Sequence, residues 1–447
     1  MKPLARVTRV IADALVGLSL ALTAVAIVAL VLQWRGTVRP GVDDDAAVAF
    51  ALAAIGNGLA ALGLRAWTRN VGWPTAVGER LAATSLATLV LIGSAAVPIW
   101  LCGPEGPGPS LLESAATLTG TGFGSIDDVD ARFARPLLLW RGVAQWLGGL
   151  GFIAFGTLLR PRSEGDVGVA LRSYAALSLC LVVALALSGL GPLDALVYGL
   201  GALSTGGLGT YDAGASAYGP APRAILAVGA ALAGIRPGLW WEVVRTRSTA
   251  TLWSDADARA WLGFLAFGWI LLVILGDPAP TSRALDAAST TGFVRSDNAG
   301  SATLLVYVAL TAVGGCRGSA AGGIGPARCV LLLRAAVWAA VRVISPSRVA
   351  PLDPDEVIDA VGAVVAWGGL VAVATVLLSA VGGLSAGAAL SVAAVTASSG
   401  GADAVGLDAQ RLANLPAVGT VVLVGVMIVG RLGPLRALAL LTLRRTP

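Results

Sequence analysis

The chain has 447 residues, a formal charge of +5 and a mean hydropathy of +0.81. Only 13% of its residues are charged, against about 25% in a soluble domain, and no polar stretch is long enough to form a core of its own. These values exclude a soluble globular protein, and the scattered basic residues form no patch with interleaved aromatics of the kind that binds nucleic acid. We therefore expect a single all-α polytopic membrane protein, with the lipid bilayer as its surroundings.

Ten apolar runs are long enough to cross a bilayer. The first follows three basic residues, is longer than a signal-peptide core and has no clear cleavage site, so we expect it to remain as a membrane helix. The ten runs cover residues 8–33, 46–64, 81–101, 137–158, 168–188, 221–240, 258–276, 302–341 with an interruption, 357–382 and 414–443.

Charge alternates across these predicted spans. Excess arginine marks the cytoplasmic side of membrane proteins, which predicts a cytoplasmic N-terminus. With the N-terminus in the cytoplasm, the arginines on the cytoplasmic side are Arg65, Arg69, Arg80, Arg160, Arg162, Arg245, Arg247, Arg342, Arg348, Arg444 and Arg445. On the outer side it places Asp43, Asp44, Asp45, Glu105, Asp127 and Asp128.

Four segments on the outer side resemble one another, because in each of them hydroxyl residues lead into glycine. They are Leu118–Gly124, Leu203–Gly209, Ser289–Val294 and Ala397–Ala402. With Gly122, Gly206, Gly292 and Gly400 as markers, the successive spacings are 84, 86 and 108 residues. Each segment follows an apolar stretch of 8 to 12 residues, too short to cross a bilayer, at 110–118, 192–203, 282–289 and 385–396. The pattern predicts four repeats of membrane helix, pore helix, glycine loop and membrane helix.

The predicted repeats divide the chain into five parts. Residues 1–75 form two extra N-terminal membrane helices, and the four pore repeats follow at 76–162, 163–250, 251–348 and 349–447. The third repeat contains the interrupted span.

Non-helical backbone at membrane depth is tolerated only where it is buried in protein or lines a watery cavity, so four such loops indicate a pore. Glycine lets successive carbonyls point at one axis, and these oxygens together with hydroxyl oxygens replace the hydration shell of a cation. For any single loop, glycine beside Ser or Thr also fits a turn or close helix packing. The predicted filter residues are Thr121, Gly122, Phe123, Thr205, Gly206, Gly207, Thr291, Gly292, Phe293, Ser399, Gly400 and Gly401.

Six glycines within residues 314–325 should break the third repeat's second helix in mid-membrane, and we expect this stretch to form a flexible plug below the filter. Arg431 lies well inside the last apolar run, where an arginine costs at least about 2.5 kcal/mol unless it is paired or hydrated. We expect it to face the pore; burial against carbonyls and snorkelling to the cytoplasm are the alternatives. The predicted gating residues are Gly314, Gly315, Arg317, Gly318, Gly322, Gly323 and Arg431.

Six segments in this order resemble the potassium-transporting subunits of the Trk, Ktr and HKT superfamily. They are 113–123, 140–151, 204–212, 290–293, 314–324 and 430–434. The resemblance implies K⁺ uptake across the bacterial inner membrane, with K⁺ as the transported ion, no catalytic residues and no cofactor in this chain. It also implies a homodimer and a separate cytoplasmic ring subunit that binds nucleotides and moves the gate. The two extra N-terminal helices are similar to the Trk type, and the GRLGP motif and short tail to the Ktr type.

The sequence departs from the superfamily pattern in two places. Loop four lacks the usual Asn and Pro, which leaves its register open by one residue, and Arg317 stands where a small residue is usual. Behind the first loop, Arg141 is interpreted as an interfacial anchor, and Glu113 as a group that accepts backbone hydrogen bonds or pairs with an arginine.

Two other functions remain as alternatives. One is a sodium-handling relative, although Gly122 stands where serine accompanies sodium transport in this superfamily. The other is a membrane-embedded enzyme acting on lipid-linked substrates, although the chain has no histidine and few carboxylates in its spans.

Overall fold

The computed structural model describes residues 2–35, 45–103, 106–126, 128–158, 167–293, 300–345, 351–401, 411–412 and 414–442. Several residues named above lie outside these ranges. They are Asp43, Asp44, Glu105, Asp127, Arg160, Arg162, Val294, Arg348, Ala402, Arg444 and Arg445.

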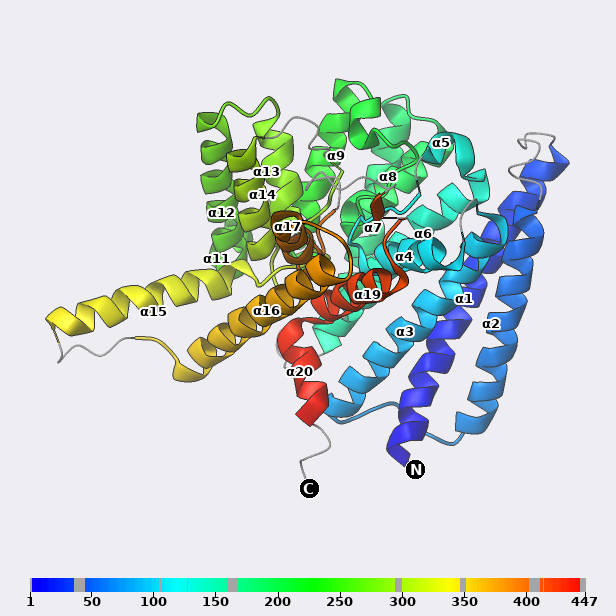
Figure 1. The fold of residues 1–447 in the computed structure, drawn as a ribbon, viewed down its shortest axis with the longest axis horizontal. Helices are drawn as coiled ribbons and strands as arrows, with labels where there is room; N and C mark the ends of the chain where they lie inside the picture. Colours follow the sequence, from blue (N-terminus) through cyan, green and yellow to red (C-terminus); the bar gives the residue numbers. More distant parts are fainter. Residues whose placement is uncertain are drawn as a thin grey trace.

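All regular secondary structure in the described ranges is helical, as expected (Figure 1). The helices that lie along the predicted spans are α1 (Lys2–Trp34), α2 (Ala46–Thr68), α3 (Val77–Cys102), α6 (Arg135–Leu158), α7 (Val167–Leu187), α9 (Pro220–Ala233), α10 (Pro237–Thr246), α12 (Ala256–Ile274), α14 (Ser301–Val313), α15 (Pro326–Ile344), α16 (Pro354–Ala380), α19 (Ala417–Leu432) and α20 (Pro434–Thr442). Short helices are α4 (Pro107–Thr119), α8 (Pro192–Ser204), α13 (Pro280–Ser289) and α17 (Ala386–Ala397), together with α5 (Val129–Arg132), α11 (Ala250–Ser254) and the 3₁₀ turn η1 (Gly214–Ala217).

Seven described helices are long and apolar enough to cross a membrane as single spans: α1, α2, α3, α6, α7, α12 and α16. Each coincides with a predicted run. The predicted interruption of residues 302–341 is also present, since α14 ends at Val313 and α15 begins at Pro326.

The prediction of an unbroken helix over 221–240 is wrong. This run forms α9 and α10, which meet at an angle of 98°. Arg236 is extended, as the residue before a proline prefers, and Pro237 starts α10. At the bend Gly234 lies so close to Trp261 that an added Cβ would stand 2.3 Å from its ring, so the packing itself requires glycine. The bend turns α10 away from the axis of α9.

The last predicted run, 414–443, is also divided. Between α19 and α20, Gly433 has a φ of +89° and is followed by Pro434. A positive φ and a proline together end a helix, since neither fits the regular helical backbone. A glycine is therefore required at this joint.

The four short helices α4, α8, α13 and α17 coincide with the four predicted pore helices. Most of their residues are buried. By contrast, α1 and α2 pair at one side of the molecule and expose many leucine and valine side chains, as a surface in contact with lipid would (Figure 1). The short helices therefore end inside the protein, where their C-terminal loops meet.

Candidate functional site

The four short helices predicted as pore helices, α4, α8, α13 and α17, end in the same backbone turn. At each end one residue adopts the left-handed conformation: Gly120, Thr205, Thr290 and Ser399, with φ of 64°, 57°, 58° and 59°. The next residue donates its N–H to the carbonyl five residues earlier. These bonds run from Thr121 to Ala116 (3.0 Å), Gly206 to Gly201 (3.0 Å), Thr291 to Asp286 (3.0 Å) and Gly400 to Val395 (2.8 Å). This is the hydrogen bond of a Schellman helix end, repeated four times.

The shared turn fixes the register of the loops. Counting from the left-handed residue, Gly122, Gly207, Gly292 and Gly401 occupy the same position, at successive spacings of 85, 85 and 109 residues. The markers Gly206 and Gly400 therefore stand one position too early. In both loops two glycines are adjacent, so the sequence offers two choices and only the turn decides between them.

The four aligned glycines converge. A Cβ added to Gly122 would stand 3.2 Å from the Gly401 Cα, and one added to Gly292 would stand 3.0 Å from the same atom. A Cβ on Gly207 would lie 2.5 Å from the Thr291 carbonyl oxygen. Four loops whose first and last aligned glycines are 279 residues apart in sequence thus form one ring, which we call the glycine ring, and a side chain there would have to displace its neighbours.

All twelve predicted filter residues lie in these four loops, and all but Gly207 are buried. The side chains of Phe123 and Phe293 are packed in the apolar core, and Phe293 lies 5.3 Å from the ring of Tyr198. These two residues can therefore contribute only backbone oxygens. The Thr121 and Thr291 hydroxyls contact hydroxyls two residues earlier, Thr119 at 3.2 Å and Ser289 at 2.6 Å.

A buried ion pair supports the first two loops. Arg141 Nε donates to Glu113 Oε1 at 2.7 Å, and the two side chains are only 4% and 1% exposed. Glu113 Oε2 also accepts the Ser125 N–H, while Arg141 Nη1 donates to the Gly209 carbonyl. Both predicted roles of Glu113 are present. The interpretation of Arg141 as an interfacial anchor is wrong, because this arginine ties loop one to loop two inside the protein.

Two supporting residues were not predicted from the sequence. The Gln145 amide bonds to both backbone groups of Leu208, at 3.0 and 3.1 Å. Asp286 accepts the Phe293 N–H at 2.8 Å and the Tyr307 hydroxyl at 3.0 Å. Gln145 follows Arg141 by one helical turn on the same face, so helical spacing would have revealed it. A carboxylate in a short apolar helix was the available signal for Asp286.

The stretch Gly314–Gly325 lies against the ends of the pore helices. Its Ala320 carbonyl accepts bonds from the Thr205 hydroxyl (3.0 Å) and from Arg431 Nη1 (2.7 Å). The Gly322 N–H donates to the Thr290 hydroxyl at 3.1 Å. Thr205 and Thr290 are the left-handed residues two positions before the ring glycines of their loops. This stretch therefore contacts the turns that lead into the glycine ring. We call residues 314–325 the glycine plug.

The glycine plug is also tied to the bend of the second repeat, because the Cys316 N–H donates to the Gly234 carbonyl at 2.8 Å. Within the plug, Gly315 N–H bonds to the Gly322 carbonyl, and an added Cβ on Gly314 or Gly323 would overlap the opposite strand of the loop. The plug is thus a closed turn held at both of its ends.

Arg431 is 5% exposed, and its guanidinium lies 4.2 Å above the Phe152 ring. Its Nη1 reaches the plug through Ala320, while Nε and Nη2 have no hydrogen-bond partner among the described residues. Nη2 stands 3.5 Å from the position of a Cβ on Gly120. The charge is therefore buried against a carbonyl and an aromatic face, directly beside the pore-helix ends.

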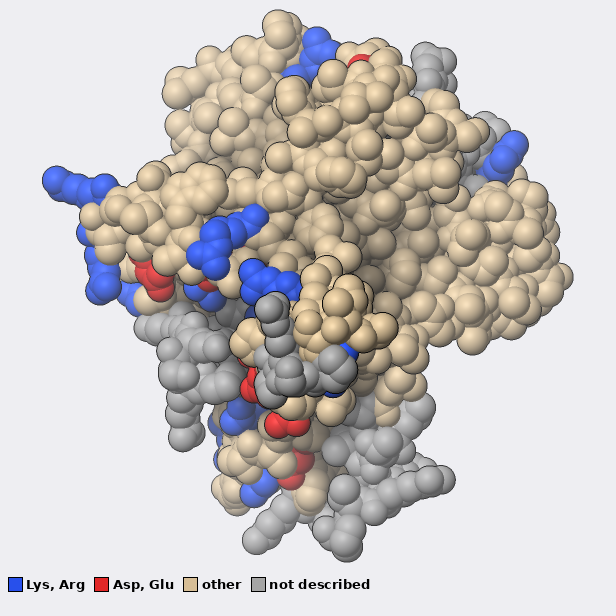
Figure 2. Space-filling view, turned by 90° about the vertical axis from the view of Figure 1, so that its left-hand side faces the viewer, with Lys and Arg blue, Asp and Glu red and all other residues tan. Residues whose placement is uncertain are grey.

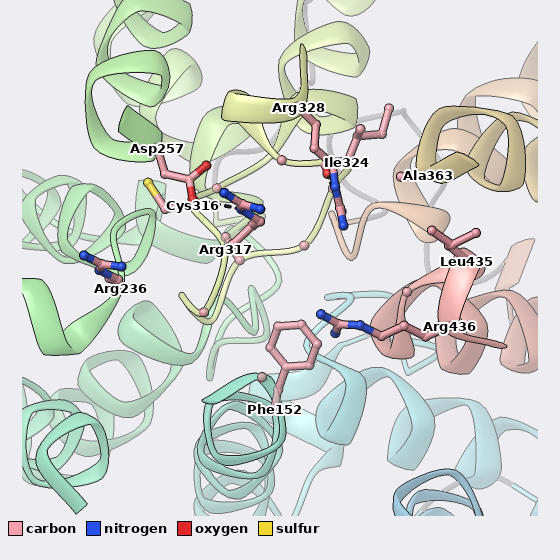
Figure 3. Close-up of a pocket in the computed structure, with 18 of the residues that line it drawn as sticks. Phe152, Arg236, Asp257, Cys316, Arg317, Ile324, Arg328, Ala363, Leu435 and Arg436 are labelled. Carbon is pink, nitrogen blue, oxygen red and sulfur yellow. Dashed lines mark hydrogen bonds and ion pairs between the residues drawn. The ribbon is translucent and has the colours of Figure 1, made fainter. Parts of the chain in front are cut away.

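A cavity of about 770 Å³ opens on the other side of the glycine plug (Figure 3). Arg328 and Arg436 point into it, and Arg317 turns aside to pair with Asp257 at 3.1 Å. Two further ion pairs stand in its wall, Arg236–Asp255 at 2.7 Å and Arg328–Asp359 at 2.9 Å. Among the described residues no cluster of His, Cys, Asp and Glu could hold a metal ion. The arrangement is a polar chamber separated from the glycine ring by the plug and Arg431.

Several known proteins are similar to this chain in sequence or fold. No protein-family model matches the chain. The potassium uptake protein TrkI of Halomonas elongata is 29% identical over 292 residues, a match that spans 59% of that protein. TrkH of the same organism is 27% identical over 410 residues, which span 83% of that protein. TrkH of Salmonella typhimurium is 24% identical over 379 residues, which span 78% of that protein.

The fold is that of a solved structure. The crystal structure of the potassium transporter TrkH from Vibrio parahaemolyticus superposes with a TM-score of 0.86 at 22% identity, over 99% of both chains. The resemblance seen in the sequence motifs and the all-helical membrane fold are both confirmed.

Proposed function

We propose that the chain is a transporter, and not an enzyme, and that it takes up K⁺ across the bacterial inner membrane through the glycine ring. The proposal is supported by the similarity of the chain, in sequence and fold, to the membrane subunits of Trk potassium uptake systems. The ion would move down its electrochemical gradient, driven by a membrane potential worth about 2.3 kcal/mol per charge per 100 mV.

The convergence of four identical turns carries this proposal. Because α4, α8, α13 and α17 all end at the ring, each directs the negative end of its dipole, roughly half an elementary charge, at the same place. We propose that backbone oxygens of the four loops surround that place, none of which carries a fixed charge. Such a site suits a weakly hydrated monovalent cation. In the register of the turn, the proposed filter segments are Thr121–Phe123, Gly206–Leu208, Thr291–Phe293 and Gly400–Gly401.

Flux measurements test the proposal. We expect the purified chain in vesicles to carry ⁸⁶Rb⁺ inward under a negative-inside potential, with excess external K⁺ competing and excess Na⁺ not. Equal competition by Na⁺ would favour the sodium-handling alternative, against which Gly122 is the argument from sequence. An inserted, correctly folded protein without any flux would count against the pore itself.

We propose that the glycine plug closes the path until a partner moves it. Deleting Ser319–Gly322 removes the contacts of Ala320 and Gly322 with the pore-helix ends, so flux through the isolated protein should rise severalfold. Arg317→Gln serves as the control for charge, because it leaves these contacts in place. If this control alone reproduces the whole gain, the plug acts by electrostatics; if neither variant changes flux, the plug is no gate.

Arg431 is proposed to raise the barrier for cations beside the ring. Arg431→Ala removes that charge together with the bond to the Ala320 carbonyl, so cation flux should increase or lose its regulation. Arg342→Ala, an exposed arginine of α15 that lines no described cavity, is the matched control and should leave flux unchanged. Parental flux in a well-expressed Arg431→Ala protein would assign this residue to packing alone.

We also propose a homodimer, a cytoplasmic N-terminus and a cytoplasmic nucleotide-binding ring subunit as the partner that moves the plug. The arginine distribution supports the orientation. The chamber beneath the plug supports the partner, since a loop held at both ends needs an external force to leave its place.

A further inference from the structure

A second cavity, of about 980 Å³, lies between α12, α15 and α16, away from the glycine ring. The helix α12 lines it with one face, which includes Arg259, Phe264 and Phe267, and α15 contributes Leu331, Leu333 and Arg334. We call it the lateral groove. On the side of the molecule that carries α15, several basic residues lie at the left and centre of the view with acidic residues among them, while much of the remaining surface is uncharged (Figure 2).

The lateral groove combines two chemistries. Phe267 and Leu333 are both 60% exposed, which is unfavourable in water and favourable against an acyl chain. Arg334 makes no ion pair with any described residue, and Arg259 uses its Nη1 on the carbonyl of Trp253. A ligand with an apolar chain and an anionic head satisfies both halves of this surface.

Carboxylates also line the groove, and they are accounted for within the protein. Asp359 pairs with Arg328 at 2.9 Å. Asp355 and Glu356 stand in the first turn of α16, where the positive end of the helix dipole offsets their charge. The arginines at positions 259 and 334 therefore remain for an outside anion.

The groove and the central chamber share part of their walls. Arg317, Arg328, Glu356 and Asp359 line both cavities. Arg317 belongs to the glycine plug, its side chain is 53% exposed, and it pairs with Asp257. An anion in the groove would compete with Asp257 for this arginine.

We propose that the lateral groove binds an anionic phospholipid, with its chain along α12 and α15 and its phosphate at Arg259 and Arg334, and that this lipid biases the glycine plug through Arg317. The second half of this proposal rests on the proposed gating function. In the predicted orientation the groove lies at the cytoplasmic leaflet, where anionic lipids attract basic residues. The exposed apolar side chains favour a lipid over a soluble anion, which would leave them in water.

Native mass spectrometry of the full chain from nanodiscs of phosphatidylcholine and phosphatidylglycerol tests the binding. Phosphatidylglycerol should be retained preferentially, and Arg259→Gln and Arg334→Gln should each lower its retention about fivefold, the effect of one basic residue near an anionic headgroup. Arg342→Gln, on the same helix outside the groove, is the matched control. Gly263→Leu should exclude the lipid by filling open space on the α12 face, whereas Gly151→Leu, which also faces open space, should not.

Three outcomes would overturn the proposal: equal retention of both lipids, release of phosphatidylglycerol by inorganic phosphate alone, or cross-links between two copies at Leu333 that persist as lipid is added. For regulation, flux in phosphatidylcholine vesicles should change when phosphatidylglycerol is added, and Arg317→Gln should remove this response while lowering lipid retention less than Arg259→Gln or Arg334→Gln does. A response that survives Arg317→Gln refutes the regulatory half. Because lipid retention is measured without transport, a protein that moves no ions would refute the proposed function and leave the binding result standing.

Discussion

Replacing Glu113 by alanine is expected to destabilise the folded protein by about 3–5 kcal/mol, the usual cost of removing one partner from a buried ion pair. The variant would leave the Arg141 guanidinium charged and buried, and the Ser125 N–H without its acceptor. Thermal unfolding followed by size exclusion in detergent measures the effect. Glu113→Gln keeps an acceptor for both donors and should recover part of the loss.

The matched control for this prediction is Glu79→Ala. Glu79 also pairs with an arginine, Arg6, at 3.2 Å, but the two side chains are 16% and 31% exposed. A partly exposed pair of this kind contributes far less than a buried one, about 1 kcal/mol, so this variant should unfold close to the parent. If Glu113→Ala is as stable as Glu79→Ala, the pair with Arg141 does not hold the first two loops together.

Gly207→Ala is expected to lower the rate of selective flux tenfold or more. This corresponds to an increase of about 1.4 kcal/mol or more in the activation free energy. Two causes act together. The φ of +70° costs a residue with a side chain about 1–2 kcal/mol, and the new Cβ would lie 2.5 Å from the Thr291 carbonyl oxygen. That oxygen belongs to the proposed filter, so relief of the overlap must move it. The measurement is ⁸⁶Rb⁺ flux with Na⁺ competition.

Gly383→Ala separates the two causes. Gly383 has a φ of +69°, nearly the same as Gly207, but nothing lies within 4 Å of an added Cβ. It should share the backbone cost and keep its selectivity. Similar selectivity in both variants would mean that the glycine ring does not determine which ion passes.

The sequence predicted the elements of this fold better than their connections. Short apolar stretches bounded by proline, glycine and hydroxyl residues located the pore helices, because membrane-depth helices too short to span have few other structures open to them. The number of continuous spans was overestimated at 221–240, although Arg236 and Pro237 interrupt this apolar run. Hydropathy reports the surroundings of a helix and not its direction, so it does not by itself reveal a 98° bend.

The candidate site shows the same division. The composition of the sequence showed which residues belong to the four loops. The register of loops two and four depends on which residue adopts the left-handed conformation. In these loops it is Thr205 and Ser399, which are not glycines, so the sequence did not indicate them. Arg141 stands near the start of its helix, a place typical of anchors, and only the tertiary contact with Glu113, 28 residues away in sequence, shows its role. Pairings of this kind carry no local signal.

The four loops share one turn but differ in what holds them. Loops one and two are joined through Arg141, loop three is fixed within its own repeat by Asp286, and at loop four the Trp367 indole reaches the Ser398 hydroxyl at 3.1 Å. In a pore built from four identical chains, every substitution is copied four times, and each quadrant must tolerate the same change. A single chain is free of that constraint. Each quarter of the proposed pore can therefore change by itself, so rigidity and ion preference can be altered in steps of one loop.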